Sequence, residues 1–317
     1  GGLVLDIGSN DATLLSAYPP GDSVLVGVDP TGAKFRRYYP AHVQLIPEFF
    51  SATLIQERFG HRRAKIITSI AMFYDLESPL DFMRQIHEVL ADEGIWVFEQ
   101  SYMPTMLMQN SYDTVCHEHL EYYRLGPIKW MTDRAGFKII DIEFNAANGG
   151  SIAITVAKQE NGAFSECHGK IAAIVAEEQH LGLSGLEPYE AFRVRVDESR
   201  GRLAEFVSDV NAQGKRLLGY GASTKGNVIL QYCGLSSAQI PCIAEVNSDK
   251  FGCFTPGTLI PIVSETEAKT LEPDYFLVLP WHFRDAIVER ERDFLATGGG
   301  LVMPLPLLEV VRSVSGA

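Results

Sequence analysis

LVLDIGSNDATLL, residues 3–15, is the stretch that decides the fold. An apolar strand pattern ends in an acid, a turn follows at Gly8, and a helical pattern covers residues 10–17. Glycine lets a backbone approach a ligand closely, and a helix N-terminus offers N–H groups that have no partner within the helix. A second apolar run, residues 24–28, leads to Asp29, where a carboxylate can accept hydrogen bonds from a ribose diol. The pattern predicts a nucleotide-binding strand–turn–helix unit.

The glycine spacing of this turn indicates which nucleoside it binds. A dinucleotide fingerprint has a second glycine two residues after the first, but here Asn10 stands two residues after Gly8. An acidic turn suits a cofactor with a cationic sulfonium and an ammonium better than one with two phosphates. We therefore favour S-adenosylmethionine over NAD, with a turn that binds no ligand as the further alternative. Pro30, Phe49 and Ser69 are also expected to contact the cofactor.

Composition limits the possible partners. The chain has 317 residues, of which 46% are apolar, and this allows two domains with substantial cores. A net charge of −13 without a basic cluster argues against a nucleic-acid partner. No apolar run has membrane-spanning length and no signal peptide is visible, so we expect no membrane partner. The five cysteines have no C-x-x-C spacing, which is typical of reduced thiols in a cytoplasmic protein.

The order of predicted elements indicates a fold class. Strand and helix patterns alternate through the first half, which is typical of a parallel sheet with helices on both faces. Strands 137–144 and 151–157 are joined by the turn-rich residues 145–150, and such an antiparallel hairpin is the usual end of a class I methyltransferase sheet. A second α/β unit begins with strand 216–220. We predict an α/β protein with three parts: a class I methyltransferase Rossmann-like domain (1–159), a helical connection (160–213), and a second, smaller Rossmann-like domain (214–317).

Residues 111–123 contain the densest group of reactive side chains. They include two histidines, three carboxylates and three tyrosines. A His-x-His pair can bind a metal, but no third ligand can be placed, so we expect no metal site. Imidazole near neutral pH can instead take a proton from a carbon beside a carbonyl, a carboxylate can orient that base, and a tyrosine can stabilise the enolate. The alternative is the start of a helix whose aromatic side chains only pack.

The turn after strand 216–220 carries glycine, hydroxyl and N–H groups together with Lys225. These groups suit a phosphate or a pyrophosphate. A solvated lysine on a surface turn is the alternative interpretation.

Three separated segments resemble one family in the correct order. They are CHEHLEYY at 116–123, NGGS at 148–151 and YGASTKGN at 220–227. Together they resemble the S-adenosylmethionine-dependent C-methyltransferases that act on nucleotide-linked 4-ketodeoxysugars, and the resemblance covers essentially the whole chain. It implies methylation of a nucleotide-diphosphate 4-keto-6-deoxy sugar at the carbon beside the ketone. It also implies that the C-terminal domain helps to hold the nucleotide diphosphate.

The resemblance assigns roles to particular residues and shows two departures. Glu118 and His119 match the acid and base pair of the family. Members of the family usually begin with a small cysteine-rich zinc domain. No such segment is seen before the first strand pattern, so we expect this chain to lack the zinc domain. Many members have a histidine just after the fourth strand, where this chain has Tyr74 and Asp75. Two interpretations stay open: one of these two residues takes its role, or the substrate differs.

The predicted site residues fall into three groups. The catalytic residues are His119, Glu118, Tyr74 and Tyr123. The cofactor-binding residues are Asp6, Gly8, Asn10, Asp29, Pro30, Phe49 and Ser69. The substrate-binding residues are His117, Tyr122, Tyr220, Ser223, Lys225 and Asn227.

Alternatives to this function remain open at this point. The first is an O- or N-methyltransferase acting on a sugar or a related small molecule. The others are an NAD-dependent sugar oxidoreductase and a nucleotide-sugar binding protein without catalysis. In each case we expect a cytoplasmic monomer or homodimer.

Overall fold

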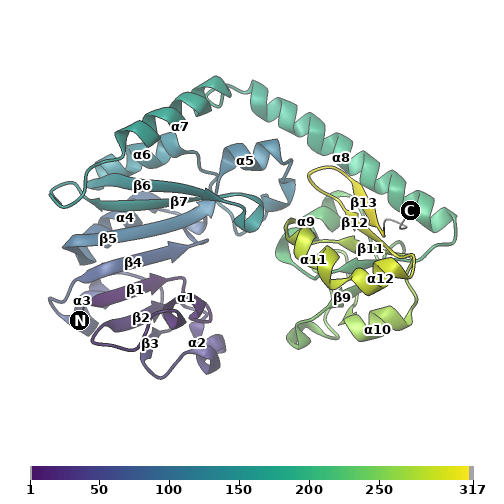
Figure 1. Ribbon diagram of the computed structural model, residues 1–317, viewed down its shortest axis with the longest axis horizontal. Coiled ribbons are helices and arrows are strands. Elements are labelled where there is room, and N and C mark those ends of the chain that lie inside the picture. The colour runs from purple at the N-terminus through teal and green to yellow at the C-terminus, as the bar shows by residue number, and fades with distance from the viewer. Residues whose placement is uncertain (1, 314–317) are drawn as a thin grey trace. The chain divides into compact units, whose positions relative to one another are not determined.

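The computed structural model describes residues 2–313, which form two compact units (Figure 1). The first unit contains the described residues up to Pro104 together with Glu118–Ser184. The second contains Thr105–His117 and the described residues from Gly185 onward. The chain therefore passes into the second unit, returns, and passes into it again.

The sheet of the first unit has the strand order β3-β2-β1-β4-β5-β7-β6. All neighbouring pairs are parallel except those made by β7, which is antiparallel to both β5 and β6. This order confirms the predicted class I methyltransferase fold with its antiparallel hairpin. The strands are β1 (Leu3–Ile7), β2 (Val24–Val28), β3 (Val43–Ile46), β4 (Ala64–Ile70), β5 (Leu90–Ser101), β6 (Phe137–Asn145) and β7 (Ser151–Lys158).

Helices cover the sheet of the first unit because their apolar side chains recur with helical spacing. In Pro79–Val89, proline stands in the first turn, where its missing N–H removes no helical bond. Phe82, Met83, Ile86 and Val89 of this helix are buried in the core. The helices of this unit are α1 (Thr13–Ser16), α2 (Gly32–Phe35), α3 (Ala52–Phe59), α4 (Pro79–Val89), α6 (Leu125–Arg134) and α7 (His168–His180). Helix α5 (Met103–Met108) begins in the first unit, but its residues from Thr105 onward belong to the second.

The predicted helix over residues 10–17 is wrong in its extent, because α1 covers only four residues. Asn10 and Ala12 have φ angles of 46° and 63°, in the left-handed region that a right-handed helix cannot contain. The turn after β1 is therefore a long irregular loop. Any ligand there meets loop N–H groups rather than the end of a long helix.

The second unit contains a second doubly wound sheet of order β10-β9-β8-β11-β12-β13. Only β13 is antiparallel to its neighbour. This confirms the second, smaller Rossmann-like fold. Its elements are α8 (Glu187–Ala212), β8 (Leu217–Tyr220), α9 (Thr224–Tyr232), β9 (Ile243–Glu245), β10 (Ile262–Ser264), α10 (Glu265–Thr270), β11 (Tyr275–Val278), α11 (Arg284–Arg290), α12 (Arg292–Ala296), β12 (Gly300–Met303) and β13 (Glu309–Arg312).

The compact units differ from the predicted parts of the chain in two segments. Helix α7, within the predicted connection, belongs to the first unit and buries Ile171 in its core. Residues 105–117, within the predicted methyltransferase domain, belong to the second unit. There they include the 3₁₀ helix η3 (Tyr112–Thr114), whose Tyr112 is buried in the second unit's core. None of the helices in residues 2–313 is long and apolar enough to cross a membrane.

Candidate active site

A cavity of about 930 Å³ lies in the first unit, and we call it the cofactor pocket. The loops that follow β1, β2 and β4 contribute to its wall, which is where ligands bind in doubly wound sheets. Of the predicted cofactor-binding residues, it is lined by Asp6, Gly8, Asn10, Asp29, Pro30 and Phe49.

Asp29 connects the two loops on which this pocket depends. One carboxylate oxygen accepts a hydrogen bond from the backbone N–H of Asn10 at 2.8 Å, and the other accepts from the N–H and hydroxyl of Thr31, each at 2.7 Å. A carboxylate has about four lone-pair positions, so Asp29 can still accept a hydrogen bond from a ribose hydroxyl. Phe49 is 82% exposed and lines the same pocket, so its ring is available to stack on an aromatic base.

Two positions near this pocket require glycine for different reasons. Gly8 has a φ of 76°, which a residue with a side chain rarely adopts. At Gly27, within β2, a Cβ atom would lie 2.5 Å from the hydroxyl oxygen of Ser9. The loop after β1 can therefore lie directly against β2 only because this position has no side chain.

Two carboxyl groups of the pocket have raised pKa values. Burial raises the pKa of Asp6 to about 6, although the hydroxyl of Thr68 donates to it at 2.6 Å and opposes the rise. Burial and the nearby charge of Glu118 raise the pKa of Asp75 to about 6. Asp75 and Glu118 both line the pocket, so its wall carries more negative charge than the opening turn alone predicts.

Ser69 is placed apart from the other predicted cofactor residues. It is fully buried, and its hydroxyl oxygen accepts a hydrogen bond from the indole N–H of Trp96 at 3.1 Å. It does not belong to the pocket wall that the other residues form. Met72 and Leu76, which follow β4, line the pocket instead. Their position directly after β4 is the signal that could have identified them.

The predicted catalytic residues Tyr74 and His119 lie together in the first unit. The centres of their rings are 4.3 Å apart. The backbone N–H groups of Leu120 and Glu121 donate to the carbonyl oxygen of Tyr74 at 3.0 and 3.1 Å, which fixes this segment beside the 3₁₀ turn after β4. His119 is half-buried.

Tyr123 lies apart from the cofactor pocket. Its ring packs against Phe73 with the centres 5.4 Å apart, and it lines a separate cavity with Arg124 and Trp130. Its buried hydroxyl has no hydrogen-bond partner among residues 2–313, and burial raises its pKa. Tyr122 beside it is partly exposed.

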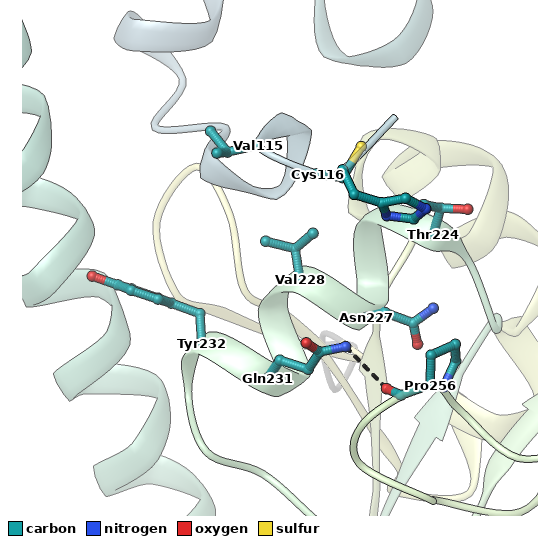
Figure 2. A pocket seen from close by; sticks show the side chains of 9 residues that line it. Val115, Cys116, Thr224, Asn227, Val228, Gln231, Tyr232 and Pro256 are labelled. Atoms are coloured by element: carbon teal, nitrogen blue, oxygen red, sulfur yellow. Dashed lines mark hydrogen bonds between the residues drawn. The ribbon is translucent and has the colours of Figure 1, made fainter. Parts of the chain in front are cut away.

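A second cavity, of about 500 Å³, lies within the second unit between residues 115–117 and α9, and we call it the second-unit pocket (Figure 2). Predicted substrate residues His117 and Asn227 line it. Sequence reasoning missed Gln231, whose side-chain amide donates to the carbonyl oxygen of Pro256 at 2.9 Å, as Figure 2 shows. The lining residues are Val115, Cys116, His117, Thr224, Asn227, Val228, Gln231, Tyr232 and Pro256.

The other predicted substrate residues of the second unit have structural partners. Ser223 caps α9, because its hydroxyl accepts from the N–H of Gly226 at 3.0 Å. Tyr220 is buried and donates to the carboxylate of Glu291 at 2.9 Å. Burial lowers the pKa of Lys225, and the charge of Asp113 opposes this shift.

Within the described part of the chain, no group of three or more His, Cys, Asp or Glu side chains could hold a metal ion.

The strand order and the cofactor pocket define the class of this protein as a class I methyltransferase. A family model described as a methyltransferase domain matches residues 1–142, and one described as a C-methyltransferase C-terminal domain matches residues 146–306. The C-methyltransferase NovU of Streptomyces niveus is 31% identical over 316 residues, which cover 99% of this chain and 75% of NovU. The chain belongs to the C-methyltransferase family. It is an S-adenosylmethionine-dependent methyltransferase, which excludes the NAD-dependent and non-catalytic alternatives.

Solved structures of methyltransferases also resemble part of the chain. An S-adenosylmethionine-dependent methyltransferase from Mesorhizobium loti is 13% identical with a TM-score of 0.39, over 49% of this chain and 91% of that chain. The 1,6-didemethyltoxoflavin-N1-methyltransferase of Burkholderia thailandensis, solved with S-adenosylhomocysteine, is 14% identical with a TM-score of 0.38, over 50% of this chain and 71% of that chain.

Proposed function

We propose that this protein methylates the α-carbon of a nucleotide-diphosphate 4-keto-6-deoxy sugar through an enolate. The observation that carries the proposal is the pairing of His119 with Tyr74, next in sequence to Glu118 on the wall of the cofactor pocket. An imidazole and a phenol in contact provide a base and a hydrogen-bond donor. Carbon methylation beside a ketone needs both groups, whereas transfer to a hydroxyl or an amine needs only the base.

In the proposed reaction, His119 removes the proton from the α-carbon and becomes imidazolium. The electrons of the C–H bond form the enolate, and its oxygen accepts a hydrogen bond from Tyr74. S-adenosylmethionine, when bound, supplies the methyl group as an electrophile. The enolate carbon that His119 and Tyr74 generate would be the nucleophile for this methyl group, and the neutral thioether of S-adenosylhomocysteine would be the leaving group. Glu118 stabilises the imidazolium by its negative charge.

Tyr123 is a second candidate for the enolate donor. Its unpartnered buried hydroxyl is a donor that no protein group within residues 2–313 uses. However, Tyr74 contacts His119 directly, so the geometry supports Tyr74 better.

We assign the nucleotide part of the substrate to the second-unit pocket. Its volume and its mixture of amide, imidazole and aromatic side chains support this assignment. The side-chain amides of Asn227 and Gln231 provide donors and acceptors for the edge of a base. Lys225 lies one residue from the pocket residue Thr224 and adds positive charge for the diphosphate.

Exchange of the α-proton tests the proposed chemistry. The protein is incubated in deuterium oxide with S-adenosylhomocysteine and thymidine- or uridine-diphosphate 4-keto-6-deoxyglucose. We expect deuterium to enter the α-carbon with the wild-type protein and not with His119→Ala. Methyl transfer without any deuterium exchange would support the O- or N-methyltransferase alternative.

The proposal places the enzyme in the cytoplasm, in the synthesis of deoxysugars. The five cysteines, all within the described part of the chain, are free, as expected for a reducing compartment.

A further inference from the structure

Asp113 is a buried acid for which the proposed chemistry has no use. It lies in η3 and is completely inaccessible to solvent. One carboxylate oxygen accepts a hydrogen bond from the indole N–H of Trp281 at 2.8 Å. The other has no hydrogen-bond partner within residues 2–313. Both Asp113 and Trp281 belong to the second unit.

A carboxylate in this position is costly for stability. Removing a charge from water carries a large penalty, which the indole N–H of Trp281 and the nearby backbone N–H groups of Asp113 and Thr114 offset only in part. Burial accordingly raises the pKa of Asp113, while the nearby charge of Lys225 favours its ionised form. An apolar side chain of similar size would avoid the penalty. The cost favours a role for Asp113 other than packing.

The segment 105–117 is attached to the second unit at three places. Arg195 of α8 donates to the carbonyl oxygen of Leu107 at 2.8 Å, and the amide of Asn110 donates to the carbonyl oxygen of Arg195 at 3.3 Å. The ring of Tyr112 packs against Tyr232 of α9 with the centres 5.3 Å apart. The bond from Trp281 to Asp113 is the third attachment, and it lies two residues before Val115, the first residue of this segment that lines the second-unit pocket.

The end of this segment forms one wall of the second-unit pocket. Val115, Cys116 and His117 line it opposite α9, as Figure 2 shows for the first two. The N–H of Val115 donates to the carbonyl oxygen of Tyr112 at 3.0 Å, and the N–H of Cys116 donates to that of Thr114 at 3.0 Å. These bonds connect η3 rigidly to the wall, so a movement of Asp113 also moves the wall.

We propose that Asp113 is a positioning residue, which holds η3 against Trp281 and thereby fixes residues 115–117 as a wall of the second-unit pocket. Asp113 itself does not contact the ligand. The inference rests on the proposed function only in taking the ligand to be a nucleoside diphosphate.

The test measures nucleotide affinity in four variants of the full chain. Asp113→Ala removes the acceptor, Trp281→Phe removes the donor, and Asp113→Asn keeps an oxygen that can accept from Trp281. Leu301→Ala is the matched control, because Leu301 is buried in a different core cluster of the second unit. Thymidine and uridine diphosphate are the probes in calorimetry, with S-adenosylhomocysteine as the probe of the first unit.

We expect Asp113→Ala and Trp281→Phe to bind the nucleotide about tenfold more weakly, because a displaced wall misplaces its contacts. Asp113→Asn should stay within about threefold of the wild type, since a neutral acceptor keeps the hydrogen bond. Affinity for S-adenosylhomocysteine should not change in any variant. Leu301→Ala should lower the melting temperature and leave nucleotide affinity unchanged, which separates positioning from general stability.

Two outcomes would overturn the inference. One is wild-type nucleotide affinity in Asp113→Ala, and the other is an equal loss in Leu301→Ala. If the wild type binds neither nucleotide, the assignment of the nucleotide to this pocket fails, and hydrogen exchange then tests the positioning role alone. Faster amide exchange in residues 111–117 of Asp113→Ala than of Leu301→Ala supports the role, and equal exchange refutes it.

Discussion

Among single residues, His119 has the most direct consequence for activity. We expect His119→Ala to lower kcat by about 10²–10⁴-fold, the usual contribution of a general base. Affinity for S-adenosylhomocysteine should stay close to the wild-type value, because His119 packs on Tyr74 and is absent from the residues that line the cofactor pocket. Steady-state kinetics and calorimetry measure the two quantities.

Tyr74→Phe is the matched variant for this experiment, since it keeps the ring against His119 and removes only the hydroxyl. A loss of kcat in Tyr74→Phe with deuterium exchange retained would identify Tyr74 as a stabiliser of the enolate rather than as a support for His119. Wild-type turnover in His119→Ala would show that another group is the base.

Asp6 makes cofactor binding sensitive to pH. Its pKa is raised to about 6, so the carboxyl is mostly ionised at neutral pH and becomes protonated as the pH falls through that value. A cationic cofactor favours the ionised form. We therefore expect affinity for S-adenosylmethionine to fall by up to about tenfold between about pH 7 and about pH 5, as measured by calorimetry.

S-adenosylhomocysteine is the control ligand for this pH dependence, because it lacks the sulfonium charge and should show a weaker effect. Asp6→Asn should remove most of the difference between the two ligands. Asp75 also has a pKa of about 6, so Asp75→Asn is the matched variant. If Asp75→Asn removes the difference and Asp6→Asn does not, the sensitivity belongs to Asp75.

At the level of elements, one side chain of α7 holds the start of α6. Glu178 is buried and accepts hydrogen bonds from the backbone N–H groups of Leu125 and Gly126 and from the hydroxyl of Tyr102. These N–H groups belong to the first turn of α6 and have no partner within that helix. The carboxylate therefore replaces the side-chain cap that the residue before α6 does not provide.

We expect Glu178→Ala to lower the free energy of unfolding by about 3 kcal/mol, because it leaves several buried donors without an acceptor. Glu178→Gln keeps one oxygen acceptor and should lose less. Urea denaturation followed by circular dichroism measures both changes. A loss below about 1 kcal/mol in Glu178→Ala would mean that water or another group replaces the carboxylate.

Elements with a strong local pattern could be predicted from the sequence, and those that depend on distant contacts could not. The predicted apolar run over residues 24–28 matches β2, because it is bounded by turn residues. The predicted helix over 10–17 is wrong in its extent, because Asn10 and Ala12 have positive φ angles and the N–H of Asn10 donates to the distant Asp29. The edge strand β13 carries two charged residues and gave no strand pattern.

The predicted site residues show the same difference: positions set by the local pattern could be predicted, and contacts with distant elements could not. Residues in the loops after β1 and β2 line the cofactor pocket, because strand ends fix where such loops lie. The sequence could not show the partners of buried hydroxyls, such as Trp96 for Ser69 and Glu291 for Tyr220. Those depend on side-chain directions set by distant elements. The sequence identified Asp113 only as one of three acids within residues 111–123 and did not predict its burial or its bond to Trp281.

For the whole molecule, the division of the chain predicts how fragments behave. A chain that ends at residue 184 keeps the segment 105–117 but loses the second unit that buries Tyr112 and binds Asp113. We expect this fragment to bind a hydrophobic dye strongly and to aggregate, because the exposed segment is partly apolar. Dye fluorescence and soluble yield are the measurements.

The matched control is the same fragment with residues 105–117 replaced by a glycine–serine linker of equal length. It should bind less dye and give a higher soluble yield. Equal behaviour of the two fragments would show that the segment does not need the second unit to remain folded.

The return of the chain at Glu118 also restricts how such enzymes can exchange parts. The second unit is encoded in two separate pieces, so a chimera joined once after residue 184 combines the Asp113 segment of one parent with the Trp281 loop of the other. A functional transfer of the second unit between relatives therefore needs three crossovers, one on each side of residues 105–117 and one after residue 184. Acceptor specificity would then be inherited as a pair of linked segments rather than as one C-terminal half.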